Sequence, residues 1–235
     1  ESLDIRALCH EMAAIFGGRM PHVHGIVPGG TSSPATEGQI REFRSRLKTV
    51  REFVEKRYVP LLYLLSESYD DLAHTGRGWA TAMCMGVFPH PDSDEKAIRP
   101  GVWAGGRELP FEPGKVMENV RYSWFTEQSG GSPFSAPPLV VDLNKAGAYS
   151  FSKARYDGMP MEVGPHARLW IGDMELSPMG RELAPRHLGI RAKTFRELGE
   201  EFVFSIMGRH LARAEETWFV ANAMEGWLDA LHPGE

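Results

Sequence analysis

The sequence is poor in cysteine, and this scarcity excludes several classes of protein. It has 235 residues but only two cysteines, Cys9 and Cys84. Two cysteines cannot supply a disulfide scaffold, a zinc site made of thiolates or a four-cysteine cluster. The longest apolar run, residues 58–65, is also short and contains Pro60, whereas a membrane-spanning helix needs about 20 residues. The sequence therefore predicts no transmembrane segment in this chain.

An excess of positive charge is also missing. Lys and Arg total 26 against 31 for Asp and Glu, so the formal net charge is −5. A protein that follows nucleic-acid phosphates needs the opposite balance, and we expect no nucleic-acid partner. Apolar residues make up 42% and charged residues 24% of the chain. These values exclude a disordered tail or a membrane protein and are typical of one large domain or two small ones.

The first residues lack the features of a natural N-terminus. Glu1 is not a methionine, no apolar segment of the signal type follows it, and apolar periodicity starts at once. Signal segments have a recognisable apolar stretch before a cleavage site. We therefore expect the sequence to be an interior piece of a longer product, or one part of a split product.

Apolar spacing predicts helices in the first third of the chain. Apolar residues three and four apart predict an amphipathic helix over residues 5–15, which the glycine pair at 17–18 ends. A loop rich in proline and glycine follows. Thr36, with Gln39 three residues later, then predicts a capped helix that runs to about residue 58. Pro60 is expected to break or kink this helix before a second helix over residues 61–69.

The middle of the chain has a different pattern. Between residues 76 and 151, short apolar runs alternate with clusters of Gly, Pro, Asp and Ser, which is typical of strands and turns. Gly105-Gly106 predicts a hairpin turn. Thr194 and Glu197 form a second possible capping box, for a long helix that ends near Leu228. The predicted fold class is mainly α with a small β-containing subdomain (α+β), a single domain in which residues 76–151 are a β-rich insertion within a helical core.

Two groups of polar residues are candidates for chemistry. His22 and His24 alternate in a loop and could hold a metal, but without a third ligand the pattern favours ordinary loop residues, one buried and one exposed. Glu162 lies among apolar neighbours and needs a partner, because an unpaired buried carboxylate is costly. The pattern favours a structural ion pair of Glu162 with Arg168, and a proton relay is the alternative.

Two segments match motifs of a known family. The first comprises residues 10–22, His-Glu-Met-Ala-Ala-Ile-Phe-Gly-Gly-Arg-Met-Pro-His, followed by Val-Pro-Gly-Gly at 27–30. It resembles the large subunit of nickel–iron hydrogenases. The second is residues 152–168, which is similar to the family's Lys-Ala-Pro-Arg-Tyr…Met-Glu-Val-Gly-Pro-Leu-Ala-Arg stretch. It departs from that stretch in lacking the proline after Ala154 and in having His166 in place of leucine. The similarity runs through nearly the whole chain in the family's order.

The resemblance implies a helical core of the hydrogenase large-subunit type and a place in an oxidoreductase complex. In this family four cysteines, arranged in two Cys-x-x-Cys pairs, hold nickel and iron, and this chain has neither pair. The resemblance thus implies a nickel–iron centre, with CO and cyanide on iron, whose ligands come from another polypeptide or segment. It also implies an iron–sulfur small subunit as partner. The complex would interconvert dihydrogen with protons and electrons, and the isolated chain is predicted to be inactive.

The resemblance also implies which residues matter in this chain. It places His22 near an iron–sulfur cluster of the partner, with Arg19, Pro28 and Gly29 shaping the same wall, and it assigns no catalytic residue or metal ligand to this chain. An alternative is a non-catalytic scaffold or maturation protein that resembles a truncated large subunit, and an inactive remnant is a third. The sequence leaves the compartment open, either cytoplasmic or periplasmic and membrane-associated through partners.

Overall fold

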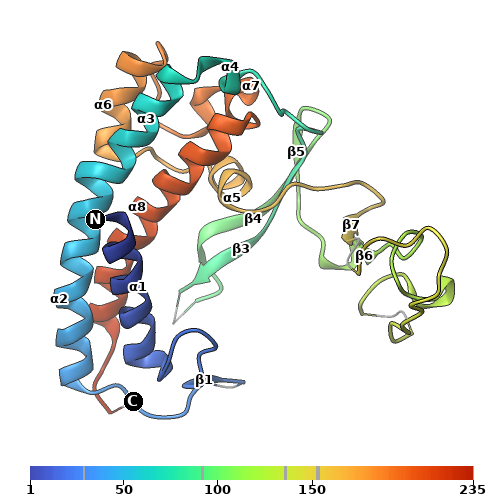
Figure 1. The fold of residues 1–235 in the computed structure, drawn as a ribbon, viewed down its shortest axis with the longest axis horizontal. Coiled ribbons are helices and arrows are strands. Elements are labelled where there is room, and N and C mark those ends of the chain that lie inside the picture. Colours follow the sequence, from blue (N-terminus) through green and yellow to red (C-terminus); the bar gives the residue numbers. More distant parts are fainter. Residues whose placement is uncertain (29, 91–92, 135–136, 152–153, 235) are drawn as a thin grey trace.

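A helical body, a small sheet at its side and a projecting lobe make up the chain (Figure 1). The computed structural model describes residues 1–28, 30–90, 93–134, 137–151 and 154–234. Helices α1, α2, α3, α6 and α8 form the body, and the lobe carries β6 and β7. Within the described residues, no helix is both long and apolar enough to cross a membrane.

The N-terminal helices follow the predicted pattern. Helix α1 spans Ser2–Gly17 and ends at Gly18, whose φ of 79° suits glycine. Helix α2 spans Glu37–Phe53 and packs on α1. The Thr36 side chain accepts a hydrogen bond from the Gln39 backbone, and the Gln39 side chain accepts one from the Thr36 backbone. The predicted capping box is therefore confirmed.

Pro60 does not break the helix, whereas the sequence predicted a break or a kink at this position. Helix α2 continues through a π-helical turn, η1 (Val54–Tyr58), into α3 (Val59–Ser68), which has Pro60 in its first turn. The Val59 backbone donates to the Val54 carbonyl, five residues back. Proline lacks the N–H that an α-helix would require here. The wider π-helical turn changes the pattern of backbone hydrogen bonds just before Pro60, so the chain stays helical there.

The sheet beside the body has three antiparallel strands. They are β3 (Ala82–Pro89), β4 (Lys96–Ala104) and β5 (Arg107–Leu109), in the order β3-β4-β5. Gly105 and Gly106 form the two-residue turn between β4 and β5, both with positive φ, as a hairpin of this length demands. The predicted hairpin turn is confirmed. Helix α5 (Pro165–Gly172) packs on β3 and β4.

The lobe is less regular than the sequence predicted. Strand β6 (Val116–Glu118) pairs with β7 (Ala154–Tyr156). The apolar runs 120–125 and 139–141 form no strands and meet only at an isolated bridge between Phe125 and Val141. Two short 3₁₀ turns complete this region, η2 (Pro113–Lys115) and η3 (Glu127–Ser129).

The long C-terminal helix begins later than predicted. Helix α8 spans Ile206–Ala230, with Ser205 as its N-cap, so the expected capping box at Thr194 is wrong. The short elements η4 (Arg196–Leu198) and α7 (Glu200–Val203) precede it. Gly199 separates these two elements with a φ of 91° and a ψ of 146°, a conformation that no helix contains.

The core is built around α8, which contacts α2, α3, α5 and α7. An acidic side chain, Glu215, is buried within it. Glu215 accepts hydrogen bonds from the Tyr63 hydroxyl at 3.0 Å and the Ser177 backbone at 2.7 Å, at the start of α6 (Pro178–His187). Burial raises the pKa of this carboxyl. The remaining helix, α4 (Asp70–Ala73), also contacts α8. The largest fully buried apolar side chains are Phe195, Phe204, Leu47, Ile98, Leu169, Ile171, Leu176 and Leu211.

Candidate functional site

The loop after α1 is held tightly against the end of that helix. The His24 and Gly25 backbones both donate to the Gly17 carbonyl, at 2.9 and 2.8 Å. A Cβ on Gly25 would lie 2.6 Å from the Phe16 carbonyl oxygen, and one on Gly17 would lie 2.6 Å from a Val23 methyl. Contacts this close exclude any larger residue. The two glycines therefore let the loop fold back onto α1.

His22 and Arg19 lie together in this loop. The Arg19 Nε donates to the His22 carbonyl at 2.9 Å, and both side chains are exposed. His22 has a φ of 60°, which few residues other than glycine adopt. The hydrogen bond from Arg19 closes the turn that the positive φ of His22 requires. The loop thus presents His22 at the surface in a defined backbone geometry.

The rest of the predicted wall lies further along the same loop. Pro28 is exposed in the turn between β1 (Ile26–Val27) and β2 (Gly30–Thr31), and Gly29 lies outside the described residues. Ile26 is 64% exposed. An exposed apolar side chain such as Ile26 suits contact with another protein surface.

The ion pair predicted between Glu162 and Arg168 is wrong. Glu162 instead pairs with Arg209 on α8, whose Nε lies 3.0 Å from Oε2. Arg168 makes a bidentate pair with Glu216 on α8, with contacts of 2.5 and 2.7 Å. Arg168 lies on α5, which packs against α8, whereas Glu162 precedes α5 and bridges to Ala82. The two residues therefore meet different parts of the same helix.

The Glu162–Arg209 pair ties a loop to α8. Arg209 also donates to the Gly76 carbonyl at 2.6 Å, and the Glu162 backbone donates to the Thr81 carbonyl at 3.0 Å. Residues 76–81 are thereby fixed at both ends. Sequence reasoning missed Arg209, because no local spacing relates positions 162 and 209.

The charge on Glu162 depends on two neighbours. Burial alone would raise the pKa of this carboxyl, but His166 and Arg209 outweigh burial and lower it. The His166 Nε2 lies 3.0 Å from Oε2. The other oxygen, Oε1, is buried and accepts no hydrogen bond from the described residues. Glu162 is thus an ionised carboxylate bound through one oxygen.

Relatives of the chain are enzymes of one family. A family model for nickel-dependent hydrogenases matches residues 1–234. The periplasmic [NiFeSe] hydrogenase large subunit of Desulfomicrobium baculatum is 46% identical over all of this chain, which covers 46% of that protein. The uptake hydrogenase large subunit of Azotobacter chroococcum is 28% identical, and the match covers 95% of this chain and 44% of that protein.

Solved structures of the same kind share the fold. The Ni-Fe-Se hydrogenase of Desulfovibrio vulgaris Hildenborough superimposes with a TM-score of 0.94 and 47% identity, covering 99% of this chain and 49% of that chain. The enzyme of Desulfomicrobium baculatum gives a TM-score of 0.92 and 45% identity, covering 99% and 48%. The chain therefore belongs to the nickel-dependent hydrogenase family. It spans about half the length of the relatives that it matches.

The residues of this chain do not fit a nickel site. Cys9 is exposed on α1 and stands alone there, whereas Cys84 is buried on β3, where burial raises the pKa of its thiol and disfavours the thiolate that binds metal. Across the described part of the chain, no three His, Cys, Asp or Glu side chains are grouped to hold a metal ion. His22 and His24 thus gain no third ligand there.

Proposed function

We propose that this chain is the central portion of a hydrogenase large subunit, in a complex that oxidises dihydrogen reversibly to protons and electrons. One observation carries the proposal. The chain shares its fold with solved hydrogenases over 99% of its length at 47% identity. Similarity this extensive, through the helical body, sheet and lobe alike, supports the same role in the same kind of assembly.

The ligands of the metal centre in the complex would come from outside this chain. We propose that another polypeptide or segment supplies the thiolates for a nickel–iron centre with CO and cyanide on iron, since soft metal sites of this kind need thiolate sulfur. The two solved relatives are named Ni-Fe-Se hydrogenases, so selenium is a further element to look for. In this arrangement the chain packs around part of the metal pocket, and another polypeptide or segment completes that pocket.

An iron–sulfur small subunit is the proposed electron-transfer partner. The exposed loop with His22, Arg19 and Pro28 would face it, and an imidazole N–H from His22 would bond a ligand of the nearest cluster and raise its potential. The name of the Desulfomicrobium baculatum relative, a periplasmic enzyme, supports the periplasmic location for the complete complex.

Spectroscopy of the native complex tests the proposal. The chain is tagged, purified with its partners and examined by infrared spectroscopy, elemental analysis and mass spectrometry. Bands from CO and cyanide on iron, with nickel present and a Cys-x-x-Cys polypeptide in the sample, are the expected result. Co-purification with maturation factors alone, without nickel, would reject the proposal and favour a scaffold role.

A substitution in the loop tests the role of His22. We expect His22→Ala to lower turnover about tenfold, as loss of a bond to a metal ligand commonly does, while the yield of assembled complex stays unchanged. The matched control is His24→Ala, two residues away in the same exposed loop. Equal turnover in His22→Ala and His24→Ala would reject the role assigned to His22. A loss of turnover that poorer assembly explains would reject it as well.

A further inference from the structure

Helix α6 is a weak helix by its own sequence. It has only ten residues, Pro178–His187, and a helix of this length is marginal in water on its own. Pro185 lies inside it and cannot donate a backbone hydrogen bond, and Gly180 has a low helix propensity. Contacts with the rest of the chain must therefore supply most of its stability.

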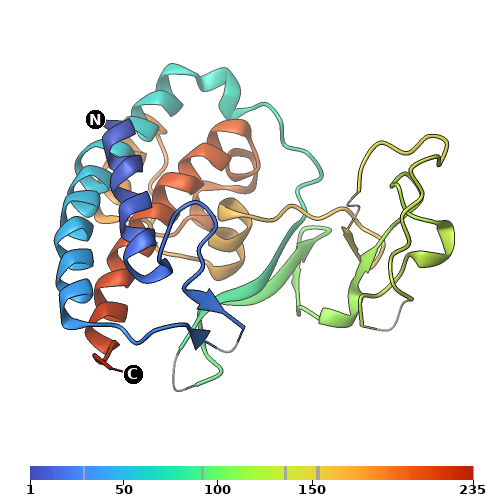
Figure 2. The ribbon, with the colours of Figure 1, turned by 60° about the horizontal axis from the view of Figure 1, so that its bottom comes forward.

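Helix α6 lies on α3, at the side of the helical body that faces away from the lobe (Figure 1). Figure 2 shows the lobe standing apart from the body in a second view. The buried face of α6 consists of Gly180, Leu183 and Ala184, two of which are small residues. Two polar contacts supplement this limited apolar packing, one at each end of the helix, and each of them involves a side chain that can take up a proton.

The contact at the start of α6 is made by the carboxyl group of Glu215, a side chain that is 2% exposed. Its Oε2 accepts a hydrogen bond from the Ser177 backbone at 2.7 Å. Its Oε1 accepts from the Ser177 hydroxyl at 3.1 Å and from the Tyr63 hydroxyl at 3.0 Å. Ser177 is the N-cap of α6, so this one carboxyl group on α8 joins α6 to both α8 and α3.

The hydrogen-bond donors to Glu215 in the described structure are all neutral, whereas Glu162 and Glu216 each pair with an arginine. Arg181, one turn into α6, favours the charged carboxylate but is itself paired with Glu175 at 3.0 Å. Burial outweighs Arg181 and the neutral donors and raises the pKa of Glu215. Proton uptake by Glu215 therefore removes a buried charge that no adjacent cation balances.

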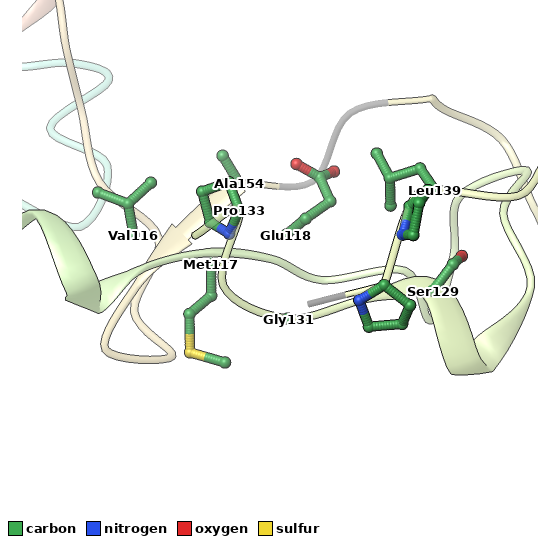
Figure 3. Close-up of a pocket in the computed structure, with 10 residues that line it drawn as sticks. Val116, Met117, Glu118, Ser129, Gly131, Pro133, Leu139 and Ala154 are labelled. Atoms are coloured by element: carbon green, nitrogen blue, oxygen red, sulfur yellow. The ribbon is translucent and has the colours of Figure 1, made fainter. Parts of the chain in front are cut away.

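Glu118 of the lobe shows how different the surroundings of Glu215 are. Figure 3 shows the Glu118 carboxylate beside a hollow whose volume is about 410 Å³, and a hollow of that size admits water. Glu118 can therefore be hydrated while it is charged. The Oε1 of Glu215 is instead packed directly against Gly180, where an added Cβ would clash with it.

The contact at the end of α6 is made by His187, its last residue. The His187 Nδ1 lies 2.6 Å from the Glu67 Oε2 on α3, and the His187 side chain is mostly buried. The contact is an ion pair only while the imidazole is protonated, and imidazoles ordinarily change charge between about pH 5 and 8. A neutral imidazole keeps at most a hydrogen bond to Glu67, without the ionic attraction.

We propose that α6 is a proton-responsive element, which docks more tightly on α3 and α8 when Glu215 and His187 bind protons and which loosens as the pH rises. Both contacts act in the same direction, and they involve residues of this chain alone, apart from the proposed hydrogenase role.

The sign of the effect follows from proton linkage. The pKa of Glu215 is raised in the folded state above its ordinary value of 4.5. The stabilisation is therefore complete below pH 4.5 and is lost as the pH rises through the folded value. At His187, the ionic attraction to Glu67 is lost when the imidazole releases its proton. The two ends of α6 thus weaken together as the pH rises.

Hydrogen–deuterium exchange in the native complex, followed by mass spectrometry, tests the proposal. Exchange of the amides in residues 181–188 is measured at about pH 5.5 and about pH 8.5, on either side of the range in which histidine ordinarily titrates. The rates are expressed as protection factors, which correct for the intrinsic effect of pH on exchange. We expect the protection of α6 to be about tenfold lower at the higher pH, which corresponds to a pKa difference of about one unit. The amides of α2 in the same sample are the reference and should keep their protection.

Substitutions assign the effect to the two side chains. Glu215→Gln imitates the neutral carboxyl group, and His187→Gln keeps a polar side chain without a charge. Each substitution alone should reduce the effect of pH on α6, and the two together should abolish it. The matched controls make the same chemical changes elsewhere, Glu118→Gln in the lobe and His74→Gln in the exposed contact with Glu201, and should leave the effect intact.

Equal protection of α6 at both pH values in the unsubstituted complex would overturn the proposal, and this comparison needs no variant to fold. An effect of pH that survives in the double variant, or that a control substitution abolishes, would overturn it as well. Nickel content and dihydrogen uptake of the same samples report on the proposed function separately, because the exchange of α6 is measured on this chain's own peptides.

Discussion

At the scale of single residues, the Glu162–Arg209 pair fixes the loop of residues 76–81 on α8. Both side chains are mostly buried, with 18% and 23% exposed. Arg209→Ala leaves the carboxylate without its main partner, and we expect it to lower the free energy of unfolding by about 2–3 kcal/mol. Arg213→Ala, one helical turn later and exposed, is the control and should cost less than about 0.5 kcal/mol. Urea unfolding, at concentrations too low for self-association, measures both.

The same pair predicts a dependence on pH. The pKa of Glu162 is lowered from its ordinary value of 4.5 by His166 and Arg209, which outweigh burial. A lowered pKa in the folded state means that the stabilisation is present above pH 4.5 and is lost as the pH falls through the folded value. The difference between wild type and Arg209→Ala should therefore shrink as the pH falls below 4.5 and through the lowered folded-state value. A difference that grows on acidification would contradict this assignment.

Two glycines of α8 allow a matched comparison of steric effects. A Cβ on Gly208 would clash with the Phe202 carbonyl oxygen, whereas a Cβ on Gly226 would meet nothing within 4 Å. Gly208→Ala forces the backbone apart, and we expect a loss of about 3 kcal/mol. Gly226→Ala gains helix propensity and should stabilise by up to about 1 kcal/mol. Thermal unfolding followed by circular dichroism distinguishes the two substitutions. Equal changes in stability would contradict the steric effect assigned to Gly208.

At the scale of elements, the N-cap of α8 can be tested by substitution and unfolding free energies. The Ser205 side chain accepts from the Gly208 backbone at 3.0 Å, so Ser205→Ala should cost about 1–2 kcal/mol. Thr194 caps nothing, and its buried hydroxyl has no hydrogen-bond partner among the described residues. Thr194→Val should therefore be neutral or slightly stabilising. Unfolding free energies that ranked the two substitutions in the opposite order would restore the capping box at Thr194.

The elements that the sequence predicted well are those with local causes. The spacing in α1, the capping box of α2 and the glycine turn after β4 each depend on residues within a few positions of one another. The start of α8 was misplaced because Glu197 accepts a hydrogen bond from the Lys193 backbone at 2.6 Å instead of capping a helix. The spacing resembled a capping box, but Gly199 turns the chain two residues later.

The candidate site was less accessible to sequence reasoning. The partners of Glu162 and Arg168 lie about 47 positions away on α8, and only the packing of α5 and α8 decides which charges meet. The assignment of His22 depended on resemblance, because an exposed loop histidine has no local pattern that marks its role. Local sequence patterns thus predicted helices and turns, whereas tertiary contacts determine which charged side chains pair.

At the scale of the whole molecule, exposed apolar side chains predict self-association. Phe134 is 73%, Trp79 75% and Leu3 78% exposed, and the net charge of −5 gives only modest repulsion. We expect the isolated 235-residue chain to form polydisperse oligomers and to bind a hydrophobic dye. Light scattering after size-exclusion chromatography measures this. A monodisperse monomer that binds no dye would show that these surfaces need no cover.

The central position of α8 has a consequence for synthesis on the ribosome. This helix contacts α2, α3 and α5, yet it follows all of them in the chain (Figure 1). A nascent polypeptide emerges from its N-terminal end, so the earlier helices leave the exit tunnel before their common partner exists. Folding of the helical body must therefore wait until α8 has emerged, and until then α2 and α3 expose to chaperones the apolar faces that α8 later covers.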